Sequence, residues 1–127
     1  MQLPAERPLS PHLQVYRPMY TMVFSILHRM SGIYLSASGF VLVAWLVAAA
    51  MGPETYARAI ACLSTLPMRI VLFLALAAFW YHLFAGLRHL SWDLGYGFEK
   101  KVARASGAVV LLLAAAAIAA SLLLSPA

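Results

Sequence analysis

The sequence predicts an all-α membrane protein with three transmembrane helices. Of its 127 residues, 64% are hydrophobic and 10% are charged, whereas soluble domains contain about 25% charged residues. Three apolar segments are each long enough to cross the hydrocarbon core of a bilayer, which takes about 20 helical residues. We therefore expect a single membrane-anchor domain over residues 1–127, in direct contact with the lipid bilayer.

The first segment, residues 21–51, is longer than one span requires, so its early turns should lie near the membrane surface. Gly52 and Pro53 follow it. Proline cannot continue a helix and glycine tolerates the conformation that ends one, so this pair predicts a stop. The residues around the single cysteine, Ala61 to Ser64, are interpreted as a loop.

The second segment, residues 67–90, begins with Pro67, which suits a first helical turn because its missing N–H would have no helical partner there. The third, residues 106–124, consists almost entirely of Ala, Leu, Val and Ile. Its alanines allow close packing against another helix. Because it has no ionisable side chain, we interpret it as scaffold.

The charge distribution predicts the orientation. The net charge is +5, and in a membrane protein such an excess sets topology and meets anionic lipid, so nucleic acid is not an expected partner. Most basic residues flank the first span's N-terminal side or join spans two and three, which makes the N-terminus cytoplasmic: Arg7, Arg17, Arg88, Lys100, Lys101 and Arg104. The N-terminus resembles no transit peptide. We expect a bacterial inner membrane rather than a mitochondrial one.

A first polar cluster lies early in the first span. Ser25, His28, Arg29 and Gly32 are three or four residues apart, and this spacing places them on one stripe of a helix. Such a stripe can hydrogen-bond a carbonyl oxygen and stabilise negative charge on it, or hold a carboxylate or phosphate. Equally, Arg29 could extend to lipid headgroups while His28 hydrogen-bonds a neighbouring helix.

A second polar cluster lies in the second span, where His82, Gly86 and His89 share a helix face. A neutral imidazole in an apolar wall, beside a glycine that leaves space, suits an axial haem ligand. A single membrane histidine is also commonly an interhelical hydrogen-bond partner. Because His28 is expected to be shallower and His12 precedes the helices, a second ligand would come from another subunit.

Two stretches resemble the signatures of a known family, the cytochrome-b membrane-anchor subunit of succinate dehydrogenase. The first combines residues 7–13 with residues 25–32, which read RPLSPHL and SILHRMSG. The second covers residues 82–95, which read HLFAGLRHLSWDLG. Both match in order and spacing, and together they cover about a quarter of the chain.

The resemblance implies a four-subunit complex (complex II). A flavoprotein subunit oxidises succinate, an iron–sulfur subunit carries electrons, and two membrane anchors form a helical bundle that helps reduce ubiquinone. This chain would then be the cytochrome-b-type anchor and would hold a b-type haem jointly with the second anchor. Succinate oxidation itself would take place on another subunit, so no catalytic residue is expected here.

The resemblance also implies roles for individual residues. His82 corresponds to the axial ligand of the haem iron, and Ser25 and Arg29 correspond to quinone-site residues. His28, Arg29 and His89 would lie near the haem propionates. Independently of the resemblance, Arg88 and His89 lie one to two turns nearer the surface than His82, where they could pair with propionates.

Three alternatives to this function remain open from the sequence. The chain could be a non-redox transporter or assembly subunit in which His82 and Arg29 connect helices. It could be a haem-free quinone anchor that needs Ser25 and Arg29 but not His82. It could also serve a fumarate reductase, because the direction of the reaction is not written in this chain.

Overall fold

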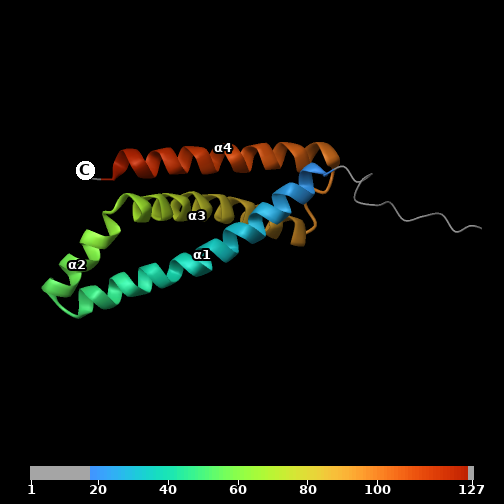
Figure 1. The fold of residues 1–127 in the computed structure, drawn as a ribbon. Coiled ribbons are helices and arrows are strands. Elements are labelled where there is room, and N and C mark those ends of the chain that lie inside the picture. Colours follow the sequence, from blue (N-terminus) through green and yellow to red (C-terminus); the bar gives the residue numbers. More distant parts are fainter. Residues whose placement is uncertain (1–17, 126–127) are drawn as a thin grey trace, which may run out of the picture.

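The computed structural model describes residues 18–125, which form four helices and no strand (Figure 1). The helices are α1 (Tyr20–Ala50), α2 (Pro53–Leu63), α3 (Leu66–Asp93) and α4 (Lys100–Leu124). Helices α1, α3 and α4 are long and apolar enough to cross a membrane. The expected all-α fold with three transmembrane helices is therefore confirmed. The N-terminal motif at residues 7–13, together with His12, Arg7 and Arg17, lies outside the described residues.

The long helices run alternately up and down. In Figure 1 the start of α1, the end of α3 and the start of α4 lie at one end, while α2 and the end of α4 lie at the other. The helices begin and end within one residue of the expected segments at most ends, but α3 continues three residues beyond residue 90 and α4 begins at Lys100, six residues before residue 106. Lysine is a good helix former, so the helix continues beyond the apolar segment.

The break after α1 follows the expectation from Gly52 and Pro53. Gly52 has φ 107°, which side-chain-bearing residues rarely adopt, and Pro53 is the first residue of α2. The loop expected at Ala61 to Ser64 is wrong for its first three residues, because they form the last turn of α2. This helix has one apolar and one polar face, and Glu54 and Arg58 form an exposed ion pair one turn apart on it.

Small residues bring α4 against its neighbours. Its buried positions are spaced four, three and four residues apart, and three of them are Ala or Gly: Ala103, Gly107, Val110 and Ala114. Tyr20 of α1 packs over Gly107 and donates a hydrogen bond to the carbonyl of Arg104 at 3.3 Å. The expectation that α4 packs through its small side chains is confirmed.

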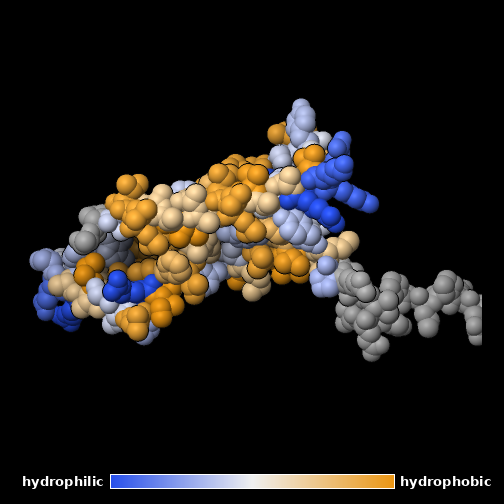
Figure 2. Space-filling view, turned by 90° about the horizontal axis from the view of Figure 1, so that it is seen from above, coloured by the Kyte–Doolittle hydropathy of each residue, from blue (hydrophilic) through white to orange (hydrophobic). Residues whose placement is uncertain are grey.

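Most apolar side chains nevertheless point outward. Only six hydrophobic residues in the described part of the chain are buried, whereas large ones such as Phe40, Ile33 and Leu112 are 66–78% exposed. Figure 2 shows an apolar middle with hydrophilic residues gathered towards the two ends. A monomer in water would not expose so much apolar surface, so lipid or other apolar partners must cover it.

Candidate functional site

His82 lies on α3 and faces α1. Its Nδ1 is 3.1 Å from the carbonyl oxygen of His28 and 3.1 Å from Oγ of Ser31. A carbonyl oxygen can only accept, so the hydrogen bond to His28 requires Nδ1 to carry the proton. Within residues 18–125, no hydrogen bond reaches Nε2 of His82. The result is an imidazole anchored through one nitrogen with a lone pair on the other, as in metal-binding histidines.

A glycine of α1 makes room for this imidazole. A Cβ atom built on Gly32 would lie 2.9 Å from Cε1 of His82, which is closer than two carbons can pack. The other glycine of the predicted site, Gly86, faces His28 instead, and the prediction that it leaves space for a haem beside His82 stays a prediction. A Cβ on Gly86 would meet Nε2 of His28 at 3.6 Å, which is an ordinary van der Waals contact.

Three histidine rings come together between α1 and α3. The ring of His28 stacks on that of His82, with centroids 4.2 Å apart and planes 12° apart, and its centroid lies 4.8 Å from that of His89. The expectation that His28 is shallower than His82 is therefore wrong, because α1 crosses α3 so that the two rings meet. Nε2 of His28 is buried and has no hydrogen-bond partner among the described residues.

The stacked geometry limits what these histidines can bind. Two axial ligands of one haem point at the iron from opposite sides, whereas the rings of His28 and His82 lie face to face. His28 is therefore not the partner ligand of His82. No group of three or more His, Cys, Asp or Glu side chains in the described part of the chain could hold a metal ion. A metal in this region would need a further ligand from beyond the described residues.

Ser25 and Arg29 form a pair beside this cluster. Nη2 of Arg29 donates to Oγ of Ser25 at 3.2 Å, one helical turn away. Arg29 is exposed and Ser25 is half-buried. The four residues of the expected stripe therefore face two ways. His28 and Gly32 face α3, whereas Ser25 and Arg29 place a hydroxyl and a permanent cation at the outer edge of the histidine cluster.

Arg88, which was expected near the haem propionates, donates hydrogen bonds to residues of α4. Its Nε donates to Oγ of Ser106 at 2.9 Å and its Nη2 to the carbonyl of Ala103 at 2.8 Å. The guanidinium also stacks over Trp92, 4.0 Å from the ring centroid, and the residue is 7% exposed. Two of its donor nitrogens thus hold α3 against α4, and the pairing of Arg88 with haem propionates stays a prediction.

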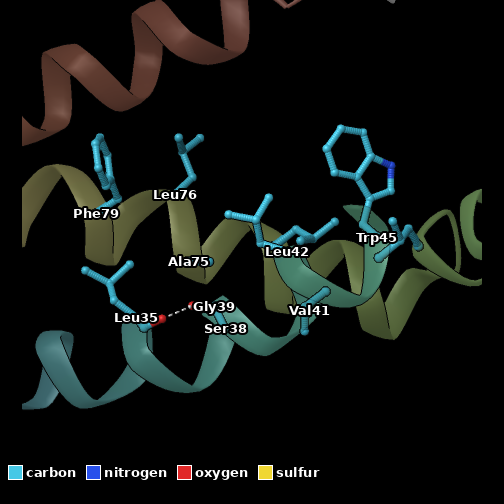
Figure 3. Close-up of a pocket in the computed structure, with 11 residues that line it drawn as sticks. Leu35, Ser38, Gly39, Val41, Leu42, Trp45, Ala75, Leu76 and Phe79 are labelled. Carbon is cyan, nitrogen blue, oxygen red and sulfur yellow. Dashed lines mark hydrogen bonds between the residues drawn. The ribbon is translucent and has the colours of Figure 1, made fainter. Parts of the chain in front are cut away.

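A separate apolar groove of about 550 Å³ lies between α1 and α3 (Figure 3). None of the histidines lines it, and neither do Ser25 and Arg29. The hydroxyl of Ser38, which lines the groove, donates to the carbonyls of Tyr34 and Leu35 within its own helix, and Figure 3 draws the second of these bonds. Apart from Ser38 and the indole N–H of Trp45, apolar side chains and Gly39 line this groove, so it differs chemically from the histidine site.

The contacts of Ser31 and Gly32 with His82 were not predicted from the sequence. Both residues lie within the stretch SILHRMSG that carried the resemblance. Ser31 is three residues after His28, and this spacing puts it on the same face of the helix. A small polar residue followed by glycine, one turn after a membrane histidine, was the available signal for a close helix crossing.

These features define the class of the protein: a helical membrane protein with three spans and a histidine-lined site between the first two. Sequence comparison then assigns it. The profile of the family described as succinate dehydrogenase/fumarate reductase transmembrane subunit matches residues 4–121. The chain belongs to this family.

Individual relatives agree with the assignment. The succinate dehydrogenase cytochrome b556 subunit of Paracoccus denitrificans is 45% identical over 100 residues, which cover 79% of this chain and 77% of the relative. The cytochrome b556 subunit of Rickettsia conorii is 38% identical over 80% of this chain and 79% of its own. The mitochondrial cytochrome b560 subunit of Bos taurus is 38% identical over 82% of this chain and 63% of its own.

Proposed function

We propose that the chain is a membrane anchor of succinate dehydrogenase that holds a b-type haem together with a second anchor subunit and helps pass electrons from succinate to ubiquinone. The state of His82 carries this proposal. Its Nδ1 is anchored to α1 and its Nε2 has no hydrogen bond within residues 18–125. An imidazole in this state suits a haem iron. The relatives of the chain are named cytochrome b subunits.

The surroundings of His82 also fit a haem. Gly32 leaves space at the ring, and His28 brings a buried nitrogen that has no partner among residues 18–125 into the same region. That nitrogen and the ring of His89 could receive the propionate groups, with Arg29 as a nearby cation. A haem held here would supply a one-electron carrier beside the route to the quinone. The second axial ligand would come from the partner anchor.

Ser25 and Arg29 are the residues that we assign to ubiquinone. A quinone oxygen gains negative charge as it is reduced, and a fixed cation with a hydroxyl beside it stabilises that charge. The Arg29 guanidinium would hold the oxygen electrostatically while the Ser25 hydroxyl donates a hydrogen bond to it. A serine hydroxyl ionises far above neutral pH, so water and an ionisable group must supply the proton through it.

The proposal includes the other subunits of the complex. A flavoprotein subunit and an iron–sulfur subunit would dock at the membrane face where α1 begins. That face would be the cytoplasmic side of a bacterial inner membrane, because Lys100, Lys101 and Arg104 also lie at that end. Family membership disfavours the non-redox transporter or assembly role. A fumarate reductase anchor would differ from our proposal in the direction of the reaction, and a haem-free quinone anchor would differ in containing no haem.

The test compares two activities of the purified, intact complex. Succinate oxidation is followed with a ubiquinone analogue and with a soluble artificial acceptor that bypasses the membrane. We expect Ser25→Ala and Arg29→Ala to lower the quinone-linked rate by about tenfold or more and to leave the soluble-acceptor rate unchanged.

The matched control is Ser36→Ala, because Ser36 lies on the same helix and donates only to the carbonyl of Gly32. It should leave both rates unchanged. If Ser25→Ala and Arg29→Ala reduced neither rate, the quinone assignment would be wrong. If both rates fell together, the variants would have impaired assembly instead.

A further inference from the structure

Ser31 is a buried polar residue to which the proposed function assigns no role. It is 9% exposed, and it and Arg88 are the polar or charged residues buried in the described part of the chain. Arg88 holds α4. Ser31 instead faces His82, whose ring it touches from the neighbouring helix.

The hydrogen bonds of Ser31 fix what it can do. Its hydroxyl donates to the carbonyl of His28 at 2.7 Å, so its proton is already used. Its remaining lone pairs can only accept, and Nδ1 of His82 lies 3.1 Å away. The N–H of His82 is therefore shared by two acceptors of α1, the Ser31 hydroxyl and the His28 carbonyl.

Other serines of the same helix lack this arrangement. Ser36 and Ser38 donate to carbonyls three or four residues back, as serines in membrane helices commonly do, and their hydroxyls form no bond to another helix. Ser31 forms the same kind of backbone bond and also contacts a side chain of α3. This difference points to a role in the site and not only in the helix.

We propose that Ser31 is a positioning residue for His82. By accepting from Nδ1–H, it keeps the proton on that nitrogen, restrains rotation of the ring and leaves Nε2 as the nitrogen that ligates iron. The proposal rests on the haem-binding function proposed above and adds a residue to it. Partners of this kind change metal affinity or activity about 10- to 100-fold when they are removed from other sites.

The experiment measures carbon monoxide binding to the dithionite-reduced, intact complex. Carbon monoxide binds a ferrous haem only when an axial position opens, so a ligand that is held less firmly admits it faster. We compare Ser31→Thr with Ser31→Val, because the two side chains have the same shape and only threonine keeps the hydroxyl. Ser31→Ala is a third variant, and Ser38→Ala is the matched control.

We expect Ser31→Val and Ser31→Ala to bind carbon monoxide about tenfold faster than the wild type, while Ser31→Thr stays closer to it and Ser38→Ala is unchanged. The ferric electron paramagnetic resonance spectrum, which reports the orientation of the axial rings, should shift in the same two variants. A purely structural role would lower the thermal stability of Ser31→Thr and Ser31→Val alike without separating their spectra.

Two results would overturn the proposal, and they differ from each other. If the wild type contains haem and Ser31→Val matches Ser31→Thr in carbon monoxide binding and spectrum, Ser31 does not position His82 and the haem assignment stands. If the assembled wild type contains no haem, the proposed haem function fails and the role of Ser31 fails with it.

Discussion

At the scale of single residues, the site depends on a close approach between α1 and α3. His28, Ser31 and Gly32 occupy little more than one turn of α1, and each contacts His82 in a different way. His28 stacks on the ring of His82, Ser31 lies within hydrogen-bond distance of its Nδ1, and Gly32 leaves room for the ring because it has no Cβ. A side chain confined in this manner loses little further entropy when it binds a ligand.

Gly32 gives the sharpest residue-scale prediction. In Gly32→Ala the new methyl group would lie 2.9 Å from Cε1 of His82, so the ring or the helix must shift. We expect the variant complex to bind haem about tenfold more weakly, measured as haem per complex after dilution and washing.

The control for this variant is Gly39→Ala in the same helix, because apart from the helix's own neighbouring backbone and adjacent residues, no atom of the described residues lies within 4 Å of a Cβ built there. It should retain the wild-type haem content. Equal haem content in both variants would mean that the close approach at Gly32 does not matter for the site.

At the scale of helices, Arg88 is the main polar connection between α3 and α4. A buried guanidinium with its donors used is stabilising, whereas removing it leaves the carbonyl of Ala103 and the hydroxyl of Ser106 without that partner. Hydrogen bonds from charged groups contribute about 1.5–3 kcal/mol each.

We therefore predict that Arg88→Ala destabilises the complex by about 3 kcal/mol, seen as a lower midpoint of thermal unfolding in detergent. Arg104→Ala is the matched control, because Arg104 is exposed and only its backbone carbonyl takes part in a contact with α1. It should change stability by less than about 0.5 kcal/mol. An unchanged midpoint for Arg88→Ala would show that the hydrogen bonds of Arg88 are not needed to hold α4.

Some of the helices, but not all of their contacts, could be predicted from the sequence. The three spans were predictable because long apolar segments and the Gly52–Pro53 break are local signals. Helix α2 was missed because its 11 residues mix polar and apolar side chains and are too short for a span. The contacts of His28 with His82 could not be predicted, because they depend on the angle at which α1 crosses α3.

Site residues divide in the same way. The spacing of Ser25 and Arg29 was enough to predict that they lie side by side on one helix, since residues four apart on a helix are neighbours, and the hydrogen bond between them agrees with this. The partners of Arg88 lie in α4, 15 and 18 residues further along the chain. No local pattern in the sequence indicates that contact.

At the scale of the whole molecule, orientation can be tested through Cys62. It is the only cysteine of the chain and is exposed, and α2 lies at the end opposite the link between α3 and α4. If the basic end faces the cytoplasm, Cys62 faces the other side of the membrane.

We predict that a membrane-impermeant maleimide labels this chain in right-side-out spheroplasts and not in sealed inside-out vesicles, with the labelled band resolved by size. Cys62→Ser should abolish the labelling and so identify the band. Labelling only in inside-out vesicles would reverse the proposed orientation.

The exposed apolar surface explains why a chain of this kind works as part of a complex. With few large side chains buried among the described residues, its three spans need lipid or other apolar partners to cover them. In the proposed function a second anchor also completes the site, because Nε2 of His82 has no hydrogen bond within residues 18–125. Sharing the haem would thus join the two anchors as well as conduct electrons.

The most direct test of this account is the reduced-minus-oxidised absorbance spectrum of the purified, intact complex, recorded with succinate and then with dithionite as reductant. We predict a b-type α-band in the wild type that is absent from His82→Ala and retained in His89→Ala, with the partner subunits present in all three preparations. A band of wild-type size in assembled His82→Ala would contradict the assignment of His82 as the haem ligand and with it the central claim.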